Sequence, residues 1–304
     1  MKIPKPQVAV GLVLLLSVVL VTATNAQETF DLKCHPFQSL EAKHPIDTSC
    51  PSPAGNATPE TSGHALQNIA KNNFCASGEP VDITHQDLLQ LQTEAEGIPG
   101  YRGWNKDNLP SSRDPFTKMS GNFKEGMLVR YTGLIYELHA ADVQSGESVN
   151  CGTKGADSND IHIAFVAHSA DKECTSITAE MSPHFRPNTW VASSIAPRLA
   201  MFLEPRPGTW VPNAAGGKLV RVTGQLMFDA AHKPCVGGRA NSGDPARGSD
   251  WEVHPVYATE VCKTTGTTCA DADWQPLDQF LGNASSGRAG NPHPKKKFFN
   301  RLLR

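Results

Sequence analysis

The sequence predicts a mainly β (α+β) fold, and three observations lead to this expectation. Five segments between residues 127 and 261 alternate polar and apolar side chains, which is typical of half-buried strands. A segment of helical composition, residues 188–204, separates the third of these strands from the fourth. Three strands, a helix and two further strands are the element order of the OB-fold. We therefore expect a five-stranded, OB-fold-like Greek-key barrel with a helical N-terminal extension.

Residues 1–26 have the pattern of a secretory signal peptide. Lys2 and Lys5 precede an apolar run, Val8–Val21, and Thr24–Ala26 offers small residues before a cleavage point at Gln27. The run is short for a transmembrane anchor, and no basic stop-transfer cluster follows it. The expected location of the mature chain is therefore the periplasm or the medium, as a secreted protein.

All eight cysteines follow the expected cleavage point. An even number in an exported chain predicts disulfide bonds, although the spacing leaves the pairing open. No pair has C-x-x-C spacing, which argues against a zinc ribbon or a thioredoxin-like redox site. The disulfide candidates are Cys34, Cys50, Cys75, Cys151, Cys174, Cys235, Cys262 and Cys269.

Residues 27–122 are expected to form a disulfide-tethered N-terminal arm with two short helices. Apolar residues recur at helical spacing over His64–Asn72. The second helix begins after the candidate N-cap Thr84 and ends at Gly97. Residues 98–122 are expected to be a polar loop.

The barrel domain is expected at residues 123–263. Its predicted strands are 127–139, 161–168, 176–181, 219–228 and 251–261. Gly133 and Gly224 fall in mid-strand, where glycine suits the strong coiling of a small barrel. Trp251 falls among the apolar positions of the last strand, which favours core packing over a stacking platform.

Residues 264–304 are expected to be a flexible tail that is basic at its end. Residues 295–304 combine basic and apolar side chains. Such a segment is either a solubilising end or makes weak contacts with an anionic surface such as lipid or cell wall.

Charge is distributed unevenly along the chain. Residues 27–287 hold 20 of the 28 basic residues and all 30 acidic residues, a net charge of −10. A strongly acidic body argues against binding to a phosphate backbone, so a nucleic-acid partner is not expected.

Several phrases in the strands resemble a group of uncharacterised exported bacterial proteins with an OB-like barrel and a WE(V/I)HPV-type strand motif. The phrases are Asn72–Cys75, Asn159–Ile163, Glu180–His184, Arg221–Asp229 and Trp251–Val256. The resemblance spans about residues 70–262 and implies export and a single barrel domain. It implies no catalytic residue, because none is established for the group.

Acid/histidine pairs recur in the predicted strands. In an OB order the third strand neighbours both the second and the fifth, so the outward faces of these strands are contiguous. One polar surface can then carry the candidate metal ligands Asp160, His162, Glu180, Glu252 and His254, with Arg221 beside them. Imidazole and carboxylate suit zinc or another divalent ion. The alternative is a structural network of polar pairs across the strands.

Two classes of function follow. The first is an exported binding or structural module whose ligand is a saccharide or peptide, held between the long loops 140–159 and 230–250. The second is a metal-dependent hydrolase, such as a nuclease, built on the acid/histidine residues. No H-E-x-x-H helix, phosphate-binding glycine loop or G-x-S-x-G elbow is present, so the sequence gives no catalytic residue and no organic cofactor.

Overall fold

The computed structural model describes residues 46–280, apart from residues 51, 60, 120, 141–143, 186–202, 207–208, 213–216, 242–245 and 278. The predicted signal peptide, the basic end of the tail and residues 188–202 of the predicted helix lie outside this part of the chain. Within it, the longest helices are too short and too polar to cross a membrane.

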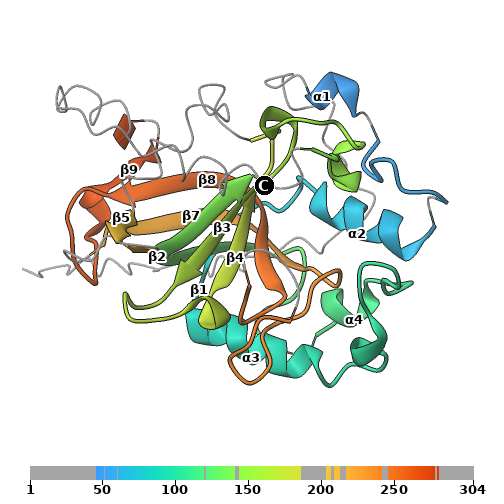
Figure 1. The fold of residues 1–304 in the computed structure, drawn as a ribbon, viewed down its shortest axis with the longest axis horizontal. Coiled ribbons are helices and arrows are strands. Elements are labelled where there is room, and N and C mark those ends of the chain that lie inside the picture. Colours follow the sequence, from blue (N-terminus) through green and yellow to red (C-terminus); the bar gives the residue numbers. More distant parts are fainter. Residues whose placement is uncertain are drawn as a thin grey trace, which may run out of the picture.

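Five strands close into a barrel (Figure 1). They are β2 (Leu128–Ala140), β3 (Ile161–Val166), β4 (Ile177–Met181), β7 (Leu219–Phe228) and β8 (Trp251–Cys262). Their order is β2-β3-β4-β8-β7, and β7 pairs back with β2. The β4–β8 pair is parallel and the other four pairs are antiparallel. This mixed, closed barrel confirms the predicted OB-like fold.

The apolar side chains of these strands fill the barrel. Val129 and Tyr131 of β2 pack with Phe165 of β3 and with Trp251 and Val253 of β8, and all five are buried. Trp251 is thus a core residue, as predicted, and its indole N–H donates to the carbonyl of Leu91. Burial of this apolar set is the main stabilising contribution to the barrel.

Gly224 lies at an irregularity in the pairing of β7 with β8. The pairing register between the two strands shifts on both sides of this residue. A Cβ atom at position 224 would lie 2.3 Å from the carbonyl oxygen of Pro255, so only glycine fits. The predicted use of a mid-strand glycine for coiling therefore has a steric cause here.

Both predicted N-terminal helices are present. They are α2 (Gly63–Lys71), whose N-cap is Ser62, and α3 (His85–Ala95), whose N-cap Thr84 forms a capping box with Asp87. In Figure 1, α2 lies beside one end of the barrel and α3 lies beneath it. A single helical turn, α1 (Ile46–Ser49), precedes them.

The predicted polar loop 98–122 is partly wrong. It contains a short helix, α4 (Asp114–Thr117), in which Phe116 is fully buried and stacks on Phe228. Arg113, directly before this helix, is also buried. The loop therefore contributes to the core, because its few apolar residues meet the aromatic side chains at one end of the barrel.

Four further strands were not predicted. β1 (Val81–Ile83) pairs with β2, and β9 (Trp274–Pro276) pairs with β8. β5 (Leu203–Arg206) and β6 (Thr209–Pro212) form a separate hairpin. Residues 203 and 204, the end of the predicted helix 188–204, are therefore in a strand.

Three disulfide bonds join described cysteines: Cys50–Cys151, Cys174–Cys235 and Cys262–Cys269. Cys75 is disulfide-bonded as well. The first bond ties the N-terminal arm to the β2–β3 loop, and the second ties the turn before β4 to the β7–β8 loop. This confirms the predicted use of cysteine and indicates an oxidising, extracytoplasmic environment.

Candidate functional site: a buried acid/histidine cluster

The polar residues of β3, β4 and β8 share one face of the sheet, turned away from the apolar core. His162 pairs directly with Glu180 across β3 and β4. Val253, between Glu252 and His254, pairs with Ala179 across the parallel β4–β8 contact. Alternation along each strand thus brings these side chains together, as the sequence pattern predicts.

This face is buried, which corrects the prediction of an outward polar surface. Asp160, Glu180, Glu252 and His254 are each at most 1% exposed. The covering comes from α2 and the residues after it: Lys71 contacts Glu180, and Asn73 donates to Gln225 of β7. Strand periodicity identifies the shared face, but it cannot show that a helix from the arm covers it.

Glu180 is the centre of the cluster. Its Oε1 lies 3.2 Å from His162 Nε2. Its Oε2 lies 2.6 Å from His254 Nδ1 and 2.9 Å from Lys71 Nζ. One carboxylate therefore faces three nitrogen groups that can carry positive charge.

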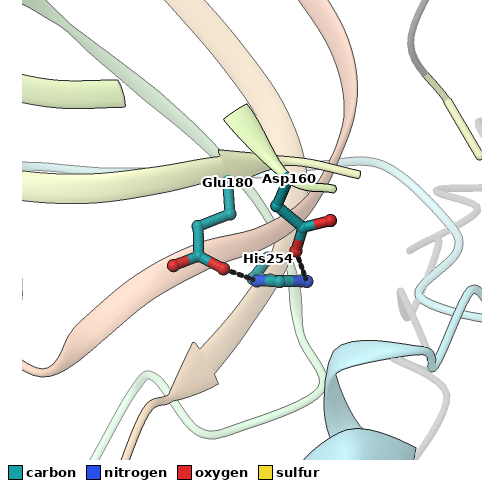
Figure 2. Close-up of side chains that lie close together, drawn as sticks. All are labelled: Asp160, Glu180 and His254. Carbon is teal, nitrogen blue, oxygen red and sulfur yellow. Dashed lines mark ion pairs between the residues drawn. The ribbon is translucent and has the colours of Figure 1, made fainter. Parts of the chain in front are cut away.

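His254 lies between Glu180 and Asp160 (Figure 2). Its Nε2 is 3.5 Å from Asp160 Oδ2, and its Nδ1 is 3.4 Å from Glu252 Oε1. Asp160 is held in place by its other oxygen, Oδ1, which accepts a hydrogen bond from Asn150. The imidazole is thus surrounded by carboxylates on both of its ring nitrogens.

Several of these buried atoms lack a well-oriented hydrogen bond. Among the described residues, Asp160 Oδ2, Glu180 Oε1, Glu252 Oε1 and His254 Nδ1 have none. Each of them instead lies at the ion-pair distances given above from a charged group of the same cluster. A buried polar atom without a hydrogen bond is costly, so this cluster stands out from ordinary strand pairs.

Lys71, Arg247 and Glu147 complete the cluster. Lys71 Nζ also lies 3.2 Å from Asp229 Oδ2 and 3.9 Å from Glu252 Oε1. Arg247 Nη1 donates to Glu252 Oε2 at 3.0 Å. Glu147 lies at the edge, where its Oε2 accepts from the backbone N–H of Asp160 at 2.7 Å.

Charge coupling shifts the pKa values within the cluster. Burial alone would lower the pKa of both histidines, but Glu180, with Glu147 beside His162, raises the pKa of His162 to about 9. In the same way, Glu180 raises the pKa of His254 to about 10 against the effect of burial. Burial opposes ionisation of Glu180, but His162, Lys71 and His254 hold its pKa well below the usual range. Without a bound cation, protons on the two histidines balance the carboxylates.

A second buried ion pair adjoins the cluster. Arg113 Nε donates to Glu125 Oε2 at 2.9 Å, and Arg113 Nη2 contacts the other oxygen of Glu125. Arg113 Nη1 donates to Gln67, whose amide in turn contacts Asp229. A continuous polar network therefore runs from α4 through α2 to the carboxylates.

The five predicted site residues converge, but the set was incomplete. Arg221 is not part of it: this residue pairs with Glu260 and lies over the Trp274 ring, 4.4 Å from the centroid. Lys71, Arg247 and Glu147 were not predicted. The only sequence signal for Lys71 was its helical spacing. It follows Gln67 by four positions, so the two side chains share one face of α2, and the structure shows that both are buried.

Among the described residues, two groups of three side chains bring possible metal-ligand atoms close together. They are Asp160, Glu180 and His254, and Glu180, Asp229 and Glu252. Within each group, one donor atom from each residue lies within 4.8 Å of the others. Lys71 lies within ion-pair distance of all three acids of the second group, whereas in the first group it contacts Glu180.

The two long loops that were candidate ligand-binding elements are both held by disulfides. The β2–β3 loop is joined to the arm through Cys151, and its Val149 carbonyl accepts from Asn72. The β7–β8 loop is joined through Cys235 to Cys174.

In comparisons with family models, curated proteins and solved structures, nothing matched this chain. The description of the site therefore rests on its own geometry.

Proposed function

We propose that this protein is an exported barrel module that binds one divalent metal ion through Asp160, Glu180 and His254. The observation that carries the proposal is Asp160 Oδ2, a buried carboxylate oxygen that accepts no hydrogen bond from the described residues and lies 3.5 Å from His254 Nε2. Two ligands of a tetrahedral zinc ion with bonds of about 2.1 Å lie about 3.4 Å apart. The separation therefore fits a shared ion better than a direct hydrogen bond.

The donor set favours a transition metal of the zinc type. Two carboxylates and an imidazole suit zinc, whereas calcium and magnesium prefer oxygen ligands alone. Asp160 lies at Nε2 of His254 and Glu180 at Nδ1, so a single ion bound through Nε2 needs the Glu180 carboxylate to turn from Nδ1 toward Asp160. Glu252, 3.4 Å from His254 Nδ1, is placed to orient the imidazole.

Burial favours a binding or structural centre over a hydrolase. A catalytic zinc site keeps one coordination position open to water, whereas a structural site is closed. The three proposed ligands are almost fully buried. Metal-dependent hydrolysis remains the alternative function, and phosphodiesterase activity that depends on Asp160 would favour it.

Metal uptake by the purified, metal-stripped protein tests the proposal. We expect one equivalent of zinc to bind the wild type, and Asp160→Asn and His254→Ala to abolish uptake. His168→Ala is the matched control. His168 is exposed and follows β3, whereas Asp160 lies before the start of this strand. Circular dichroism should show that the variants are folded. Absence of zinc binding by folded wild-type protein would overturn the proposal.

A peptide is the second candidate ligand. A pocket of about 210 Å³ is lined mainly by apolar groups, among them Met181, Phe185, Val256, Tyr257 and Leu277. Its size and the mainly apolar side chains that line it fit one apolar side chain better than a saccharide, which needs several hydrogen bonds. Acetylated leucine and phenylalanine amides should shift NMR signals of these residues, and Ala258→Trp should suppress the effect. Equal shifts with glucose would contradict this choice.

Export of the mature chain is part of the proposal. It is supported by the leader-like residues 1–26 and by the disulfides, which persist in oxidising compartments. N-terminal sequencing of protein from the periplasm or medium should begin at or near Gln27. A membrane-embedded chain that still carries residues 1–26 would contradict it.

A further inference from the structure

Lys71 Nζ lies among the three carboxylates of the second group. It is 2.9 Å from Glu180 Oε2, 3.2 Å from Asp229 Oδ2 and 3.9 Å from Glu252 Oε1. These three acidic residues are fully buried. Three buried carboxylates need positive charge beside them, and the ammonium supplies one.

Each of the three carboxylates directs one oxygen toward Lys71, and neighbouring histidines share these oxygens: His254 shares those of Glu180 and Glu252, and His232 shares that of Asp229. Glu252 uses Oε2 for Arg247, while its Oε1, which accepts no hydrogen bond from the described residues, lies 3.4 Å from His254 Nδ1 and 3.9 Å from Lys71 Nζ. Asp229 Oδ1 accepts from the backbone N–H of Ala231 and from Gln67, while its Oδ2 lies 3.0 Å from His232 Nδ1 and 3.2 Å from Lys71 Nζ. One buried oxygen from each acid is therefore directed at the same point.

We propose that the Lys71 ammonium occupies a second cation position, adjacent to Asp160 and His254 and bridged to them by Glu180, and that it excludes a second divalent ion. Because this position has only carboxylate ligands, the ion it would take without Lys71 is a hard divalent cation such as Mn²⁺ or Ca²⁺. Lys71 is the last residue of α2, so the same contact holds that helix on the barrel. The statement that this position adjoins a metal site rests on the proposed function. The second position itself is supported by the distances from Lys71 to the three carboxylates.

The test replaces Lys71 and asks whether an ion can take its place. Lys71→Met should lower the melting temperature in EDTA, because three buried carboxylates lose their counter-charge. Millimolar Mn²⁺ or Ca²⁺ should raise the melting temperature of this variant by roughly 5–10 °C at concentrations near 100-fold above Kd. The wild type should show no such response to Ca²⁺. Lys118→Met is the matched control, since Lys118 pairs with Asp114 on the surface and should behave like the wild type.

Two double variants separate this inference from the proposed zinc site. Lys71→Met with Asp229→Asn loses one ligand and should weaken the cation response at least tenfold. Lys71→Met with Asp160→Asn keeps all three ligands and should retain it, even if no zinc site exists at Asp160. The inference is overturned if Lys71→Met gains no stability from either cation, if it stays unfolded with both, or if the wild type responds equally to Ca²⁺.

Discussion

His162 and Glu180 face each other across β3 and β4, with Nε2 3.2 Å from Oε1, while the other oxygen of Glu180 contacts His254 and Lys71. His162 therefore lies behind a proposed zinc ligand rather than among the three ligands themselves. Its role is to hold the Glu180 carboxylate in position, as residues surrounding metal ligands do.

His162→Ala should weaken zinc binding by about 10–100-fold without abolishing it. Asp160→Asn, by contrast, removes a ligand and should eliminate measurable uptake. Competition with a chromophoric chelator measures both affinities. Complete loss in His162→Ala, with the fold intact, would place His162 among the ligands, and an unchanged affinity would remove its positioning role.

The stability of the metal-free protein should depend on pH on both sides of neutrality. The pKa values of His162 and His254 are raised from 6.5 to about 9 and about 10, so their stabilisation is fully present below 6.5 and is lost as the pH rises through 9–10. The pKa of Glu180 is lowered below 4.5, so its stabilisation is present above 4.5 and is lost as the pH falls. Urea unfolding in EDTA should be most difficult between about pH 5 and 6.5.

A single variant checks the alkaline half of this pH profile. His254→Gln removes one of the two protonated rings, so its unfolding free energy should change less than that of the wild type between pH 6.5 and 10. An identical slope in the variant and the wild type would show that His254 is not protonated in the folded state.

Arg113→Met should destabilise the fold by about 3–5 kcal/mol, because it leaves the Glu125 carboxylate buried without its partner. Adding Glu125→Gln should recover much of this loss, since no isolated charge then remains. Arg130→Met is the control: Arg130 pairs with a mostly exposed Asp82, and its loss should cost less than about 1 kcal/mol. Denaturant unfolding compares the three. A loss below 1 kcal/mol in Arg113→Met would contradict the argument.

The disulfides should differ in their contributions to stability. Cys50–Cys151 spans 101 positions and Cys262–Cys269 only 7. On loop-closure entropy alone, the first constrains the unfolded chain by about 4.7 kcal/mol and the last by about 2.4 kcal/mol. Paired serine variants, unfolded in urea, should follow this order. The reverse order would show that contacts of the reduced loops outweigh chain entropy.

The sequence predicted the barrel well because its strands are long enough to display their period. β2, β7 and β8 each cover ten residues or more, so alternation separates their two faces. β1 and β9 have three residues each, too few for any period, and both were missed. The same reasoning placed His162 and Glu180 on one face, since that depends only on parity within the strands.

Burial of the site was not predictable because its cover comes from a distant part of the chain. Lys71 and Glu180 are 109 positions apart, and no local pattern reports their contact. A helix ordinarily turns its apolar side inward, but α2 buries Gln67, Asn68 and Lys71. Charged partners become visible only when the three-dimensional structure brings them together.

The barrel closes between β2 and β7, which are its first and fourth strands in chain order. Neither strand gains this partner until the whole β3–β6 stretch has emerged, and β8 must follow before the parallel contact with β4 can form. The chain therefore loses loop-closure entropy before most native contacts form. We expect it to fold slowly relative to helical domains of similar size. Until β7 and β8 are available, β2 can pair only with β1 and β3, so an incomplete chain exposes apolar core residues and is prone to aggregate.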